Sequence, residues 1–161
     1  MAEQNRRKCL IAVRIRGTIR APRQVRETLE MLGLKRNNHA VLMDNRQSFL
    51  GMLKVAQNFV TWGEASEEAV DILIRKRGRL LGDKRFTDKY AQTIGEKSLE
   101  KLVKKIYKCD VQYGKLPNVK PIFKLSPPAK GFKGKVKKSY GMGGESGYRG
   151  ERINELIKRM T

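Results

Sequence analysis

The stretch CLIAVRIRG at residues 9–17 decides the fold of this chain. Its apolar residues at every second position are Cys9, Ile11, Val13 and Ile15. Arg14 and Arg16 fall on the opposite side, and alternation with a period of two is typical of a strand with one buried face. We therefore predict a half-buried β-strand over residues 9–16 that is closed by Gly17.

Helix and strand signals then alternate. Residues 22–33 begin with proline and end with glycine, as a helix does. The apolar positions of this helix are Val25, Leu29 and Leu32. Residues 40–43 predict a second strand, Asp44 or Asn45 is expected to cap a second helix, and residues 59–62 predict a third strand. This part of the chain reads βαβαβ, which predicts a two-layer α+β core with its helices on one face of the sheet.

The remaining residues change character twice. Ser66 and Ser98 each precede an apolar pattern of helical period, so we expect each of them to cap a helix. Residues 114–150 lose periodicity and are rich in Pro, Gly and Lys, and within them residues 141–147 resemble a flexible loop. The final residues predict a short amphipathic helix. We therefore divide the chain into a core over 1–63, a helical extension over 64–113, and a basic extended segment over 114–161 that ends in the short helix.

The charge of the chain indicates its partner. It carries 36 Lys and Arg against 16 Asp and Glu, a formal net charge of +20 on 161 residues. Small soluble domains carry a net charge of magnitude roughly 2–8, so this surplus predicts a polyanion, above all a nucleic acid. No stretch approaches the roughly 20 apolar residues that cross a bilayer, and the N-terminus is unlike a signal peptide. We expect a cytoplasmic protein with no membrane partner.

Signals of enzymatic chemistry are weak. The sequence has no GxxxxGK[ST], HExxH or strand-linked GxGxxG motif. Cys9 and Cys109 are isolated, and the single His39 cannot complete a zinc site with them. We therefore expect free thiols, no metal ion, no cofactor and no small-molecule substrate.

Basic residues gather in three regions. Residues 14–26 contain five Arg and no acid, and Arg presents a planar fork that suits phosphate and stacks on bases. Residues 75–79 are weaker evidence, because a helix C-terminus already favours cations. In residues 130–140 Lys alternates with Gly and aromatic residues, which favours a segment that orders on RNA over a plain linker or a solvated face. The predicted RNA-binding residues are Arg14, Arg16, Arg20, Arg23, Arg26, Lys35, Arg36, Asn37, His39, Arg46, Arg75, Arg77, Arg79, Lys130, Phe132, Lys133, Lys135, Lys137, Lys138, Tyr140 and Arg149.

A spaced set of residues runs from the first helix to the third strand: Thr28, Leu29, Leu32, Leu34, Arg36, His39, Val41, Met52, Leu53, Ala56, Phe59 and Val60. This pattern resembles that of the L7/L30 family of ribosomal proteins. Residues 13–17 and 123–127 resemble the longer archaeal and eukaryotic members. Only eight residues precede the first strand, which favours the archaeal type.

The resemblance implies a three-stranded antiparallel sheet with flanking helices, in a ferredoxin-like arrangement. It also implies a structural, non-enzymatic protein of the large ribosomal subunit that binds 23S rRNA near 5S rRNA, beside neighbouring ribosomal proteins. Two other functions stay open from the residues alone. One is an RNA-modifying enzyme or nuclease with a basic surface, and the other is a general nucleic-acid-binding protein.

Overall fold

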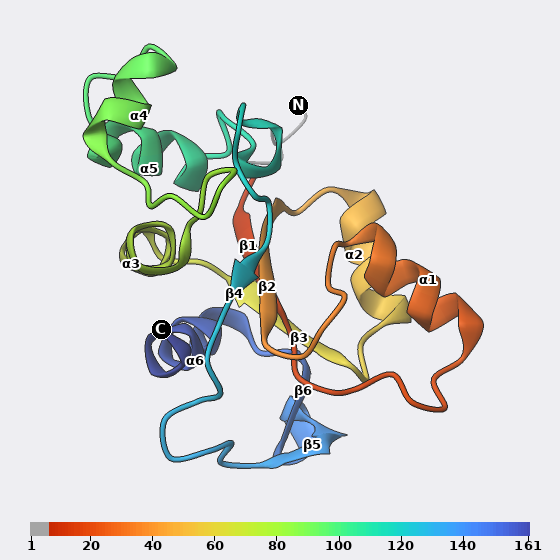
Figure 1. Cartoon of the computed structure of the whole chain (residues 1–161). Coiled ribbons are helices and arrows are strands. Elements are labelled where there is room, and N and C mark those ends of the chain that lie inside the picture. The colour runs from red at the N-terminus through yellow and green to blue at the C-terminus, as the bar shows by residue number, and fades with distance from the viewer. Residues whose placement is uncertain (1–6) are drawn as a thin grey trace, which may run out of the picture.

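One six-stranded sheet runs through the computed structural model, which describes residues 7–161 (Figure 1). Its strands lie in the order β4-β2-β1-β3-β6-β5. The strands are β1 (Cys9–Arg14), β2 (His39–Asp44), β3 (Val60–Glu64), β4 (Phe123–Lys124), β5 (Lys135–Ser139) and β6 (Gly144–Tyr148). The α-helices are α1 (Arg23–Met31), α2 (Gln47–Val55), α3 (Glu67–Arg77), α4 (Asp88–Thr93), α5 (Leu99–Tyr107) and α6 (Ile153–Met160). The short 3₁₀ helices are η1 (Tyr113–Lys115), η2 (Tyr140–Met142) and η3 (Gly150–Arg152).

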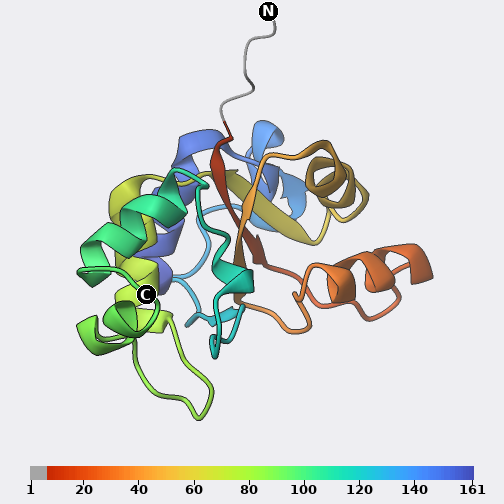
Figure 2. The ribbon, with the colours of Figure 1, turned by 90° about the horizontal axis from the view of Figure 1, so that it is seen from above.

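The sheet is the middle of three layers (Figure 2). Helices α1 and α2 cover one face, where they pack on Leu10 and Ala12 of β1. Helices α3, α5 and α6 cover the other face, where they pack on Ile11 and Val13. The predicted half-buried strand and two-layer core are therefore corrected: β1 ends at Arg14 and is buried on both faces. The second covering layer comes from residues after β3, which the βαβαβ pattern does not include.

The expectation of three strands is also wrong. β1 does pair antiparallel with β2 and with β3, as the predicted core requires. However, β4 adds an antiparallel strand beside β2, and β6 and β5 add two parallel strands beyond β3. All three additional strands come from residues 114–161. A strand rich in Lys and Gly shows no apolar alternation, so its pairing depends on its neighbours and not on a local pattern.

Residues 141–147 resemble a loop in the sequence because they are rich in glycine. They form η2 and most of β6, so the prediction of a flexible loop is wrong. Gly143 has a φ of 79°, a left-handed conformation that side chains disfavour. A Cβ added to Gly144 would lie 2.0 Å from the carbonyl oxygen of Lys138, so the two backbones approach each other there as only glycine permits.

The predicted helix boundaries are mostly confirmed. The hydroxyls of Ser66 and Ser98 each accept the backbone N–H three residues ahead, which starts α3 and α5. The predicted cap of α2 is wrong, because Arg46 occupies the cap position and its side chain makes no cap hydrogen bond. Asp44 instead accepts hydrogen bonds from the Arg46 side chain. Helix α4 was not predicted, since it is short and has no apolar period.

Candidate nucleic-acid interface

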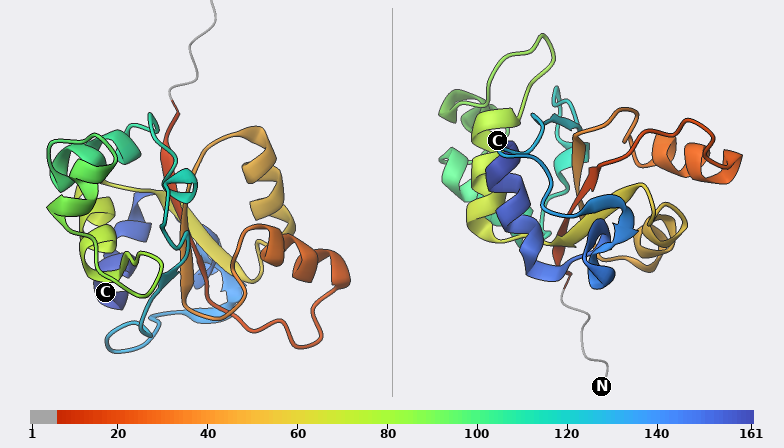
Figure 3. Two further views of the ribbon diagram at one scale, coloured as in Figure 1. Left: turned by 45° about the horizontal axis from the view of Figure 1, so that its top comes forward. Right: turned by 90° about the horizontal axis from the view of Figure 1, so that it is seen from below.

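Four segments that are far apart in the sequence leave the sheet at the same end, which is the lower end in Figure 1. β1 ends at Arg14 and β2 begins at His39 in antiparallel register, so the loops 15–22 and 35–38 lie there. β4 pairs Lys124 with His39, so the chain that follows it also leaves at this end. β6 runs parallel to β3 and pairs Gly147 with Thr61, so the first residues of β6 extend past the N-terminal end of β3. This register brings the β5–β6 pair to the same end of the sheet (Figure 3).

We call the cationic surface made by these segments the basic end of the sheet. Its exposed or half-buried cations are Arg16, Arg20, Lys35, Arg36, Lys124, Lys130, Lys133, Lys135, Lys137 and Lys138. Arg23 and Arg26 lie exposed on α1, directly after the first of the four segments. Residues 15–26, 35–43 and 120–144 contain no acid. Cations without counter-charges repel one another, so this surface suits a polyanion.

Tight turns and a ring contact shape this surface. Arg20 and Lys130 are each the third residue of a turn closed by a backbone hydrogen bond of 2.9 Å. Both have a φ of 64°, which residues other than glycine rarely adopt. The Arg16 guanidinium carbon lies 4.9 Å from the centre of the Phe59 ring, a cation–π contact that leaves Arg16 half-buried. Asn37 is exposed in the loop before β2.

The structure corrects the prediction for Arg14, whose side chain is buried inside this end and not displayed on it. Its Nε donates to the carbonyl oxygen of Arg16 at 3.0 Å, its Nη1 to the carbonyl of Leu34 at 3.1 Å, and its Nη2 to the hydroxyl of Thr18 at 3.0 Å. These bonds tie the loop after β1 to the segment before β2. Burial lowers the pKa of the guanidinium from its ordinary value. Arg14 therefore positions the two loops that carry the exposed cations.

We expect Arg14→Lys to lower the free energy of unfolding by about 1–3 kcal/mol, because one ammonium cannot serve three acceptors and a buried carbonyl is left unsatisfied. Urea denaturation of both proteins measures the difference. Arg20→Lys, at an exposed position of the same loop, is the matched control and should change stability by less than about 0.5 kcal/mol. Equal stability of Arg14→Lys and the wild type would contradict the positioning role.

The prediction that Arg149 contacts RNA is also corrected, because its side chain is only 5% exposed. Its Nη2 lies 2.6 Å from a carboxylate oxygen of Glu145, and its Nε donates to the hydroxyl of Thr61 at 2.7 Å. Its guanidinium carbon lies 4.9 Å from the centre of the Tyr140 ring. Thr61 belongs to β3 and Glu145 to β6, so Arg149 joins the two parallel strands from within.

The chain is similar to known proteins over most of its length. The family model of ribosomal protein L30p/L7e matches residues 10–60. The chain is 40% identical over 148 residues to the large ribosomal subunit protein uL30 of Methanopyrus kandleri, covering 91% of this chain and 99% of that protein. It is 43% identical over 156 residues to the uL30 of Ignicoccus hospitalis, covering 96% and 98% of the two chains. The chain belongs to the L30p/L7e family.

The L30p/L7e match contains only half of the basic end. The loops 15–22 and 35–38 lie within residues 10–60, whereas Lys124 and the β5–β6 pair lie outside them. The uL30 of Methanosphaera stadtmanae is 42% identical over 149 residues, covering 92% of this chain and 97% of its own length. Relatives of this length therefore extend over the later strands as well, and both halves of the basic end belong to the shared part of the chain.

His39 lies half-buried at the start of β2, within the region matched by the L30p/L7e family. Burial, followed by the nearby cations Lys124, Arg36 and Arg14, lowers the pKa of its imidazole below the ordinary value of 6.5. The neutral ring therefore predominates at neutral pH and adds no charge to the basic end. A phosphate contact by His39 stays a prediction.

Three predicted residues lie at the C-terminal end of α3 and have partners within the protein. Arg75 is paired with Asp71 at 2.6 Å. Arg77 donates to the hydroxyl of Ser126 at 2.7 Å, and Arg79 donates to the carbonyl of Gly78 at 2.8 Å. Arg77 links the end of α3 to the segment after β4, whereas the bond of Arg79 joins adjacent residues and that of Arg75 lies within α3. An RNA contact by any of the three stays a prediction.

Three further predicted residues are also occupied by internal contacts. Arg46 lies at the other end of β2 from the basic end and is paired with the buried Asp44 at 2.7 Å. Phe132 packs against the apolar cluster under α3, α5 and α6. Tyr140 has the Arg149 guanidinium against its ring. Stacking of these two rings on bases stays a prediction, and the structure separates Arg46 from the cations of the basic end.

Sequence reasoning missed several cations that the L30p/L7e fold places near the basic end. Lys124 is brought there only by its register with His39. Arg152 ends η3 and Arg159 lies on α6, and with Lys133 they line a cavity of about 420 Å³ between α6 and the β5–β6 pair. No local signal marks these residues, because both placements depend on contacts between distant parts of the chain.

Among residues 7–161 no helix is long and apolar enough to cross a membrane. Nor do acidic, His and Cys side chains within these residues cluster as metal ligands do.

Proposed function

We propose that this protein is a structural constituent of the large ribosomal subunit that binds 23S rRNA, near 5S rRNA, through the basic end of the sheet. The observation that carries the proposal is the unneutralised charge of that end, where four segments gather cations and residues 15–26, 35–43 and 120–144 contain no acid. RNA bound in this way is recognised mainly by its shape, its phosphates and its 2′-hydroxyls. The role is electrostatic and architectural, at the ribosome in the cytoplasm.

The relatives support this role, since the curated proteins that align over nearly the whole chain are named as large ribosomal subunit protein uL30. The carboxylates give little support to a catalytic role, because those that gather on α3 and α5 are paired with an arginine. Asp71 lies 2.6 Å from the Arg75 guanidinium, and Glu100 lies 3.9 Å from it. We therefore propose a non-enzymatic protein whose partners are rRNA and neighbouring ribosomal proteins.

In our proposal the three parts of the chain, residues 1–63, 64–113 and 114–161, contribute differently to RNA binding. Residues 1–63 and 114–161 supply the cations of the basic end. Residues 64–113 supply α3 and α5, which cover the second face of the sheet. The rRNA would thus be bound jointly by the L30p/L7e core and by the strands that extend its sheet.

Sedimentation of the tagged full-length protein from its native cell extract tests the proposal. After a high-salt wash we expect it to remain with the large subunit, because contacts fixed by shape add to the screened charge. Release into the soluble fractions, or an even spread over all RNA, would instead indicate a loosely associated factor or a general nucleic-acid-binding protein. An RNA-modifying enzyme would show turnover on the extracted rRNA.

A further inference from the structure

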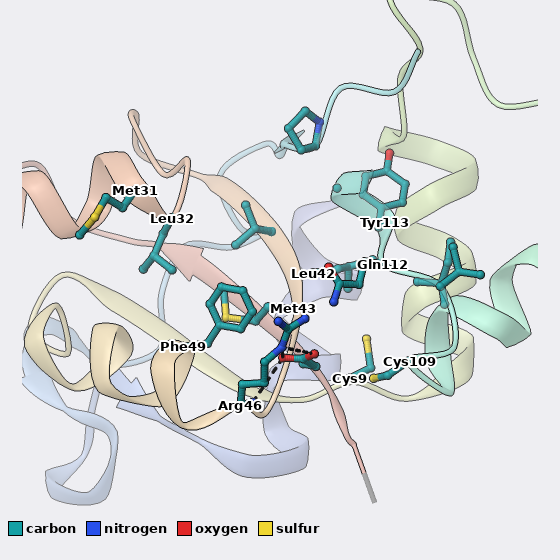
Figure 4. A pocket seen from close by; sticks show the side chains of 16 residues that line it. Cys9, Met31, Leu32, Leu42, Met43, Arg46, Phe49, Cys109, Gln112 and Tyr113 are labelled. Carbon is teal, nitrogen blue, oxygen red and sulfur yellow. Dashed lines mark hydrogen bonds and ion pairs between the residues drawn. The ribbon is translucent and has the colours of Figure 1, made fainter. Parts of the chain in front are cut away.

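Cys9 and Cys109 face each other, although they are far apart in the sequence. Cys9 is the first residue of β1, and Cys109 follows the C-terminal end of α5. Both are free thiols that interact with each other, and Figure 4 shows them side by side at the edge of a cavity. A disulfide requires two cysteines on adjacent elements whose side chains approach each other, and Cys109 packs against the apolar cluster that contains Cys9.

The two sulfur atoms differ in access and in acidity. Cys9 is buried, whereas Cys109 is half-buried, and both line a cavity of about 190 Å³ between α2 and η1. The interaction between the thiols, with burial in addition, raises the pKa of Cys9, and the same interaction lowers the pKa of Cys109. Cys109 is therefore the sulfur that ionises first and that a dissolved reagent reaches first.

Cys109, like Arg20 and Lys130, has a left-handed backbone conformation. It has a φ of 61° in the turn after α5, a left-handed conformation in which glycine or asparagine is the ordinary choice. A cysteine there costs backbone strain, and residues held in such conformations concentrate at functional positions. The strained turn places the Cys109 thiol beside Cys9.

We propose that Cys9 and Cys109 are an oxidisable pair that closes to an intramolecular disulfide when a small disulfide such as oxidised glutathione is the oxidant. The Cys109 thiolate attacks one sulfur of the small disulfide, whose S–S bond breaks and releases one thiolate. Cys9 then loses its proton and attacks the Cys109 sulfur, which releases the second thiolate. Two electrons pass from the protein thiols to the small disulfide, and the two protons leave with its two thiols.

The bond would join β1, in the part of the chain shared by the L30p/L7e family, to the segment after α5 in the helical extension. It closes most of the chain into one loop, which restricts the unfolded state and stabilises the folded one. Cys9 begins β1, whereas the basic end lies where β1 stops, so the link does not alter the proposed RNA-binding surface. The inference therefore stands independently of the proposed function.

The test treats the folded full-length protein with oxidised glutathione and follows intact mass, peptide mapping under non-reducing conditions, and Tm. We expect the wild type to lose the mass of two hydrogen atoms, to stay monomeric, to yield one peptide that joins residues 9 and 109, and to melt at a higher temperature than the reduced protein. A reducing agent should reverse all of these changes.

Two variants check the order of the steps. Cys9→Ser should stop at a glutathione adduct on Cys109, because the resolving thiol is missing, and Cys109→Ser should react much more slowly. The wild-type peptide map decides the proposal even if a variant folds poorly. A wild type that stays reduced, keeps the glutathione adduct or forms disulfide-linked dimers would overturn it.

Discussion

Replacing Lys133, Lys135, Lys137 and Lys138 together by alanine should weaken binding to 23S rRNA by a factor of about 100–1,000 near 0.15 M salt. Each phosphate contact releases about 0.7–0.9 condensed counterions, so four lost contacts also flatten the slope of log K against log salt by about 3. All four side chains are exposed, and none forms an ion pair with another residue of 7–161. The fold should therefore survive, since Val136 still packs on the apolar cluster.

A control variant with the same loss of charge makes this result specific. Lys89, Lys97, Lys101 and Lys104 are exposed on or beside α4 and α5, away from the basic end. Their joint replacement by alanine lowers the net charge equally, but it should leave most of the affinity and of the salt slope. Filter binding of full-length 23S rRNA over a salt series measures both variants. Equal losses would show that only net charge counts and would refute a defined interface.

The elements predicted from the sequence are those with a local cause. The period-two run of β1, the serine caps at Ser66 and Ser98, and the amphipathic α6 each depend on residues within one or two turns of each other. β4, β5 and β6 depend on pairing with strands far away in the sequence. Their own residues, rich in Lys and Gly, carry no periodic signal, so a basic segment and a strand rich in lysine look alike before the partner is known.

The RNA-binding residues are harder still to predict from the sequence, because charge composition does not distinguish a buried cation from an exposed one. Arg20 and Arg14 belong to one cluster in the sequence, yet Arg20 is exposed and Arg14 is buried with three acceptors. A signal for Arg14 did exist: Leu10 and Ala12, on its side of the strand, are apolar, which indicates that this side is covered too. The sequence places Glu145 four residues before Arg149, but it does not show that Thr61, which accepts from Arg149 in the structure, lies beside the pair.

Arg149→Met should lower the free energy of unfolding by about 3–5 kcal/mol, the second large effect that we expect. The substitution leaves the Glu145 carboxylate buried without a counter-charge, and Glu145 is only 6% exposed. It also removes the hydrogen bond to Thr61, which helps to hold β6 against β3. Urea denaturation measures the loss. Because Arg149 is internal, the folded variant should bind 23S rRNA as the wild type does at low temperature.

The double variant Glu145→Gln with Arg149→Met separates the unpaired charge from the lost packing. Glutamine removes the buried charge but keeps an oxygen that accepts the backbone N–H of Gly134, which lies 2.8 Å from the carboxylate in the wild type. Replacing both members of a buried ion pair is often nearly neutral, so the double variant should recover most of the stability that Arg149→Met loses. A double variant no more stable than Arg149→Met would instead assign the loss to the contacts with Thr61 and Tyr140. In that case Arg149 would join β6 to β3 by shape and hydrogen bonding, with no dependence on the charge of Glu145.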